Sequence, residues 1–170
     1  MPKKTNSNHP TYLPTYDNCY VCGQNHPRGL RARFFVGDVG KVHAHFNPEH
    51  TQTGYHNMVH GGVISTILDE ILGWPIALET KKMCFTGELT VRFLKPIPAG
   101  RTYLVTAYPG IDKGRYWEGK GDICDEDGQI YAKAQGKYFF VPNQQTAAVA
   151  AELTYLDDTL PIFREKHQSK

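Results

Sequence analysis

The stretch His60-Gly-Gly-Val-Ile-Ser-Thr-Ile-Leu-Asp-Glu70 decides the fold of this chain. Its apolar residues recur at i, i+3 and i+4 spacing, which predicts an amphipathic helix with one broad apolar face. Two glycines at the start of a helix leave backbone N–H groups uncovered, so that a substrate oxygen can approach them. Asp69 lies deep in the apolar segment, where an unpaired carboxylate is costly to bury. The stretch therefore predicts a helix that can polarise a carbonyl and supply a base.

Alternation of apolar and polar residues predicts β-strands on both sides of this helix. Two strands are expected before the helix and four after it, over residues 30–36, 41–46, 89–93, 103–108, 115–124 and 130–140. The order β-β-α-β-β-β-β provides a single helix to cover one face of an antiparallel sheet. Pro75 is expected to kink or end that helix. The chain is therefore predicted to be α+β, with an antiparallel sheet wrapped around one long central helix.

Length and composition indicate one domain with short tails. We expect a flexible segment over residues 1–16, the domain over 17–142, and a tail over 143–170 that contains room for a short helix and is frayed from residue 160. The net charge of +2 is too small to argue for nucleic acid. The longest apolar stretch, residues 58–78, carries charged groups, and the N-terminus lacks the apolar core of a signal peptide. We therefore expect a cytoplasmic protein with no membrane or nucleic-acid partner.

The four cysteines are expected to be reduced thiols, as is usual in that compartment: Cys19, Cys22, Cys84 and Cys124. The pair Cys19-x-x-Cys22 has the spacing of half a structural zinc site. One of His26, His43 or His45 could complete it, but the sequence has no second C-x-x-C. We therefore expect no metal site and no metal or redox cofactor.

Motifs along the chain then identify a family. They are Cys19-Tyr-Val-Cys-Gly23 with Pro27-Arg-Gly-Leu30, the segment His60–Glu70, the segment Thr86–Gly100, and Ala132-Lys-Ala-Gln-Gly136. In this order and spacing they resemble the hotdog-fold acyl-CoA thioesterases, specifically the phenylacetate-pathway-type family, over roughly residues 17–141. The resemblance implies a hotdog fold, hydrolysis of acyl-CoA thioesters, and self-association as a homodimer or a homotetramer built as a dimer of dimers.

The resemblance also implies roles for residues on the helix and after it. Asp69, nine residues after His60, would be the general base for a water or the nucleophile on the thioester carbonyl, and both roles stay open. Thr86 matches the position whose hydroxyl holds the attacking water or contacts the acid. The amides of Gly61 and Gly62 would form the oxyanion hole at the positive end of the helix dipole. His60 is expected to cap the helix or orient the loop rather than to transfer protons.

The loop before the helix departs from the family at two positions. Asn57 stands where glycine is common, and asparagine tolerates left-handed backbone conformations better than other residues with a side chain. Gly54 stands where some relatives carry an asparagine that contacts a carbonyl or a water. Gln52, Tyr55 or His56 could supply that contact instead. The sequence therefore offers these three residues, and no asparagine at position 54, for the second polar contact to the substrate.

The other charged residues are expected to form a salt bridge or to bind phosphate. Consecutive helix residues point about 100° apart, so Asp69 and Glu70 cannot both face one substrate. Glu70 is therefore expected to make an ordinary salt bridge. The phosphates of CoA, which enters as part of the substrate, would lie on basic residues at the sheet edge, for which Arg92, Lys95 and Arg101 are the candidates.

Helix geometry indicates that the site is shared between two subunits. Gly61 and Asp69 are eight residues apart, or about 12 Å along a helix, so one thioester carbon cannot contact both on the same chain. If both groups act, they come from two helices related by a two-fold axis. Two other functions remain on the same fold: a non-catalytic protein that binds or senses acyl-CoA, and a thioesterase for acyl groups on acyl carrier protein.

Overall fold

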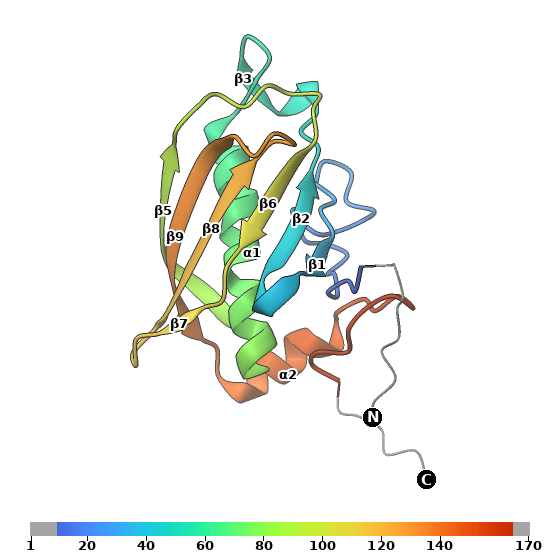
Figure 1. The fold of residues 1–170 in the computed structure, drawn as a ribbon. Coiled ribbons are helices and arrows are strands. Elements are labelled where there is room, and N and C mark those ends of the chain that lie inside the picture. The colour runs from blue at the N-terminus through green and yellow to red at the C-terminus, as the bar shows by residue number, and fades with distance from the viewer. Residues whose placement is uncertain (1–9, 165–170) are drawn as a thin grey trace, which may run out of the picture.

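The computed structural model describes residues 10–164. An antiparallel sheet packs against helix α1, Gly61–Thr80, which lies behind it in the view of Figure 1. The strands follow one another across the sheet in the order β1 (Phe34–Val36), β2 (Val42–Phe46), β6 (Tyr103–Ala107), β8 (Trp117–Cys124), β9 (Ile130–Phe140) and β5 (Cys84–Phe93). The predicted α+β architecture, one long helix wrapped by an antiparallel sheet, is confirmed.

Shorter elements are added to the predicted order. They are the 3₁₀ turns η1 (Asp38–Gly40) and η2 (His50–Gln52), the hairpin β3 (Thr53–Tyr55) and β4 (Met58–Val59), strand β7 (Ile111–Asp112), and helix α2 (Asn143–Ala151). Strand β1 is also shorter than the expected strand over residues 30–36. Arg31 has a φ of 52°, a left-handed conformation that interrupts an extended chain.

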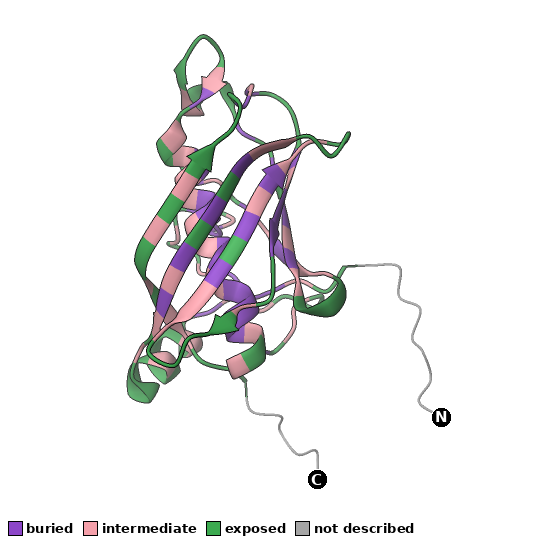
Figure 2. Cartoon of the chain, turned by 60° about the vertical axis from the view of Figure 1, so that its left-hand side comes forward, coloured by how far each residue is buried: buried purple, intermediate pink, exposed green. Residues whose placement is uncertain are grey.

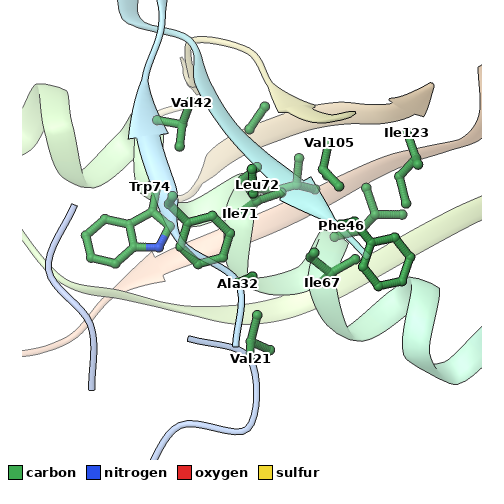
Figure 3. Close-up of a cluster of buried hydrophobic side chains, with 14 of the residues drawn as sticks. Val21, Ala32, Val42, Phe46, Ile67, Ile71, Leu72, Trp74, Val105 and Ile123 are labelled. Carbon is green, nitrogen blue, oxygen red and sulfur yellow. The ribbon is translucent and has the colours of Figure 1, made fainter. Parts of the chain in front are cut away.

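The core lies between the apolar face of α1 and the inner face of the sheet (Figure 3). Ile67 and Ile71 of the helix are fully buried, as are Val42, Val105 and Ile123 of the strands. Buried and exposed residues alternate along the strands, since successive side chains point to opposite faces (Figure 2). Each large apolar side chain that is buried contributes about 1.5–3 kcal/mol, so this interface holds the helix in place.

Glycines on β8 allow the sheet to approach α1 closely. A Cβ atom on Gly119 would lie 2.9 Å from the Leu72 carbonyl oxygen, and one on Gly121 would lie 2.7 Å from the Leu72 side chain. Small residues also occupy the inner face of the neighbouring strand β9, where Ala132 and Ala134 are buried. The sequence predicted small residues on that last strand but not the equivalent pair on β8.

Helix α1 continues through Pro75 to Thr80, so this residue does not end it, which was one of the two predicted outcomes. A proline inside a helix lacks the N–H that would bond to the carbonyl of Ile71, at a cost of about 3 kcal/mol. Trp74, Ile76 and Ala77 are buried beside it. The last turn therefore persists because its packing outweighs the lost hydrogen bond.

The tails pack more closely than the sequence indicated. Leu13 is buried and its N–H donates to the Phe34 carbonyl at 2.8 Å, so residues 10–16 are not a free segment. Ile162, in the region expected to be frayed, is buried as well. The remainder of those two expectations falls on residues 1–9 and 165–170, which lie outside the described residues.

Candidate functional site

Asp69 lies at a cavity of about 320 Å³ between α1, the start of β5 and the N-terminal segment. Thr86 on β5 lines the same cavity, so the structure brings together the acid and the hydroxyl that the sequence paired. The remaining walls are mostly apolar and include Trp74, Ala77 and Phe85. The cavity therefore places the Asp69 carboxylate and the Thr86 hydroxyl in a mostly apolar setting that suits an apolar group.

Tyr138 of β9 forms a hydrogen bond with the backbone of Asp69. Its hydroxyl donates to the Asp69 backbone carbonyl at 2.8 Å. Burial raises the pKa of Tyr138, and the nearby Asp69 charge adds to the increase, so the phenol stays protonated. Alternation along the last strand placed Tyr138 on the inner face, but no sequence signal identified its hydrogen-bond partner.

Glu70 does not make the predicted salt bridge. Among the ion pairs of the described residues none involves it, and its Oε2 shares a hydrogen bond with the Cys19 sulfur at 2.9 Å instead. Burial between α1 and the N-terminal segment holds the pKa of Glu70 well above its usual range. The prediction was wrong because the sequence does not reveal that residues 19–22 cover this face of the helix.

The two cysteines of the C-x-x-C pair differ in acidity. The Cys22 thiol donates a hydrogen bond to Cys19, which lowers the pKa of Cys19 to about 5 against the opposing effect of burial. The same hydrogen bond, together with burial, raises the pKa of Cys22. Both cysteines line the Asp69 cavity, and all four cysteines are free thiols.

The first turn of α1 supplies one free amide rather than two. His60 caps the helix, and its Nδ1 accepts the Gly62 N–H at 2.9 Å. That contact agrees with the expected capping role of His60 and leaves the Gly62 amide occupied. The Gly61 N–H has no acceptor in the described part of the chain. Of the two amides predicted to form an oxyanion hole, only that of Gly61 is therefore free in this structure.

Gly61 lies at a second cavity, separate from that of Asp69. This cavity has a volume of about 310 Å³, and Tyr55, Phe93 and Lys95 line it. The Phe93 ring would lie 3.4 Å from a Cβ atom on Gly61, so it covers the turn closely. One chain thus keeps the amide and the acid apart, as the rise of the helix requires.

The hairpin before α1 explains the unusual loop residues. His56 and Asn57 have φ angles of 42° and 61°, as in the type I′ turns that close two-residue hairpins. Asn57 therefore adopts the left-handed conformation that its sequence position predicted. The side chain of Gln52 is engaged locally, since its Oε1 accepts the Glu49 N–H at 2.9 Å. Gln52 is thus not free to replace the contact that is missing at Gly54.

The three residues predicted to contact the CoA phosphates lie in different parts of the structure. Lys95 is at the Gly61 cavity, although its Nζ also donates to the Gln129 side chain at 2.6 Å. Arg92 lies on the outer face of the sheet, in a shallow cavity of about 550 Å³ with Lys120 and Lys133. Arg101 is exposed. Lys95 is the cation that the structure brings to the first turn of α1.

Part of the chain is similar to known proteins. A family model of the thioesterase superfamily matches residues 56–132. A curated relative, the uncharacterised protein C26H8.11c of Schizosaccharomyces pombe, is 31% identical over 115 residues, which are 64% of each chain. The chain therefore spans less than two thirds of that relative.

Solved structures share the fold. A thioesterase superfamily protein is 26% identical with a TM-score of 0.66, over 73% of this chain and 60% of the other. The Escherichia coli PaaI protein of the phenylacetic acid degradation operon is 18% identical with a TM-score of 0.60, over 66% and 81% of the two chains. An acyl-CoA hydrolase from Staphylococcus aureus, solved with butyryl-CoA, CoA and CoA disulfide, is 20% identical with a TM-score of 0.57, over 62% and 65%. The chain therefore has the hotdog fold, and its residues 56–132 match the thioesterase superfamily model.

Proposed function

We propose that the protein hydrolyses acyl-CoA thioesters to the free acid and CoA. The observation that carries this proposal is the placement of Asp69 and Thr86 at one mostly apolar cavity of a chain that matches the thioesterase superfamily model. A protein of the same fold was solved with butyryl-CoA, which supports the ligand class. The apolar walls would hold the acyl group, and the carboxylate would act at the thioester carbon.

Asp69 acts in one of two ways. As a general base it takes a proton from a water, whose oxygen attacks the carbonyl carbon while the CoA thiolate leaves. As a nucleophile it attacks that carbon itself and the C–S bond breaks, so that the CoA thiolate leaves and a mixed anhydride remains, which a water then hydrolyses to the free acid and the Asp69 carboxylate. The Thr86 hydroxyl would hold the water in either case. The Tyr138 hydroxyl fixes the backbone of Asp69 and is a positioning group.

The oxyanion contact comes from a second subunit. Gly61 and Asp69 lie at different cavities of one chain, so an antiparallel pair of helices is needed to bring them together. Strand β5 is an edge strand of the sheet; its exposed Phe85 lies at the Asp69 cavity, and its exposed Phe93, with Leu94 just after the strand, lies at the Gly61 cavity. An apolar edge of this kind suits a subunit interface. We therefore propose a dimer in which the Gly61 amide faces the partner's carboxylate.

The CoA part of the substrate would enter at the first turn of α1. Lys95 lies at the Gly61 cavity and offers a positive charge to a phosphate. Arg92 and Arg101 are the further candidates along the sheet edge. The open positive end of the helix dipole favours negative charge at the same place.

A second candidate function is binding of acyl-CoA without hydrolysis. The observation that favours it is the absence of a polar side chain at Gly54, together with the local engagement of Gln52. A site with one polar contact fewer would hold the ester but orient its carbonyl less well.

A panel of aryl, medium-chain and branched CoA esters separates the two functions. Release of free CoA would be followed with a thiol reagent, against a blank for the four cysteines of the protein. We expect at least one ester to turn over in wild type and not in Asp69→Asn. If no ester is hydrolysed while several raise the melting temperature, the protein is a binding protein and the hydrolase proposal is wrong.

A further inference from the structure

Two cysteines and a carboxylate converge at the end of the Asp69 cavity. The Sγ atoms of Cys19 and Cys22 and a carboxylate oxygen of Glu70 all lie within 4.8 Å of one another. We propose that these three residues bind one transition-metal ion of the zinc class and so fasten the N-terminal segment to α1. This proposal does not depend on the hydrolysis of thioesters, in which these residues have no assigned role.

The loop is built to present two sulfur ligands. The N–H groups of Val21 and Cys22 donate to the Cys19 sulfur at 3.3 and 3.4 Å, and the Tyr16 N–H donates to the Cys22 sulfur at 3.4 Å. Backbone donors favour the thiolate, which is the form that binds metal. A Cβ atom on Gly23 would lie 2.6 Å from the Cys19 carbonyl oxygen, so the tight turn requires glycine.

The acidic and thiol groups of the cavity favour the binding of a cation. Its lining includes Asp69, Glu70 and three thiols, while none of the described lining residues is lysine, arginine or histidine. A buried carboxylate beside a thiolate is costly unless a positive charge compensates both. A bound divalent ion supplies that charge and also replaces the proton that Cys19 and Glu70 now share.

The ligand types select the kind of metal. Thiolates are soft ligands that favour zinc-class ions over magnesium or calcium. Tetrahedral zinc keeps sulfur and oxygen ligands about 3.6 Å apart, so the 2.9 Å contact between Cys19 and Glu70 must open by about 0.7 Å on binding. In the described part of the chain no fourth protein ligand joins the cluster. The fourth position would hold a water from the cavity.

A cobalt titration tests the site without any variant. The full chain would be reduced, stripped with a chelator and titrated with Co²⁺ and then with Zn²⁺. We expect a thiolate-to-cobalt charge-transfer band that saturates at one ion per chain and disappears when zinc is added. If the reduced chain shows no such band, or if Cys19 and Cys22 form a disulfide and the reduced form takes up no metal, the proposal is overturned.

Ligand variants locate the ion. Cys19→Ser and Glu70→Gln should each weaken zinc affinity by at least about 100-fold, because even the loss of a supporting residue around a metal ligand costs 10–100-fold. Cys84→Ser is the matched control, since Cys84 lines the same cavity but lies outside the cluster. Equal loss in the control, or an unchanged cobalt band in Cys19→Ser, would contradict the assignment.

Discussion

The two halves of α1 offer opposite chemistry to a substrate. At the first turn, the free Gly61 amide and the Lys95 cation lie at one cavity, and no carboxylate of residues 10–164 lines it. Two turns later, Asp69 and Glu70 lie at another cavity, and none of the described cationic side chains lines that one. The first half suits the oxygen and phosphates of an acyl-CoA, and the second suits the attack on its carbonyl carbon.

This difference is the basis for our proposal that one chain carries two half-sites. Asp69 follows Gly61 by eight positions, which separates them by about 12 Å along the helix. Neither half is complete, because the amide end lacks a base and the acid end lacks a donor for the developing oxyanion. Each prediction below changes one half and leaves the other intact.

Removal of the acid should have the largest effect. Asp69→Asn keeps the size of the side chain but removes the base or nucleophile, so kcat should fall by about 10²–10⁴-fold with ester binding little changed. Glu79→Gln is the matched control, because it makes the same change at an exposed position of α1. A nearly silent Asp69→Asn beside a damaging Glu70→Gln would show that the catalytic face has been assigned wrongly.

Loss of the amide should cost somewhat less. Gly61→Pro removes the N–H and adds a ring that the backbone can accept, since proline is favoured at the first helical position and the preceding His60 has extended angles of −62° and 134°. We expect kcat to fall by about 10²–10³-fold, the usual cost of one oxyanion donor. Gly61→Ala adds the Cβ but keeps the N–H, and should retain most of the activity. Equal losses in both variants would assign the effect to crowding against Phe93.

The acid half should also contain an unusually reactive thiol. The pKa of Cys19 is lowered to about 5, so in the metal-free chain its alkylation rate should rise through pH 5 and level off above it. At pH 7 an ordinary thiol is only about 3% thiolate, so Cys19 presents about 30 times more. Burial raises the pKa of Cys84 to about 12, and this thiol should stay unmodified. Peptide mass spectrometry after timed iodoacetamide treatment measures both, and a midpoint for Cys19 near pH 8 or 9 would contradict the structure.

The smallest effect is expected for the helix cap. His60→Ala removes the acceptor for the Gly62 N–H and should lower the free energy of unfolding by about 1 kcal/mol. His60→Asn keeps an acceptor suited to the cap and should restore most of that loss. Urea denaturation of the two variants gives the comparison, and equal stabilities would exclude a capping contribution.

The architecture could be predicted from the sequence because it depends on periodicity. The apolar spacing in α1 and the alternation in the strands determine which faces are buried, and Asp69 and Thr86 followed from their positions in motifs. Contacts between distant segments could not be predicted in this way. Glu70 meets Cys19 because residues 19–22 fold over the helix, and Tyr138 reaches the backbone of Asp69 across the sheet. Pro75 stays helical for a similar reason, since packing by distant residues outweighs a local preference.

The central claim is that a complete site takes its acid from one subunit and its amide from the other. Asp69→Asn and Gly61→Pro chains, each inactive alone, would be refolded together in equal amounts. About half of the dimers should then be mixed, and each holds one intact site, so that activity returns to about a quarter of the wild-type value. Mixed dimers that form and remain inactive would contradict the shared site, as would a monomer with full activity.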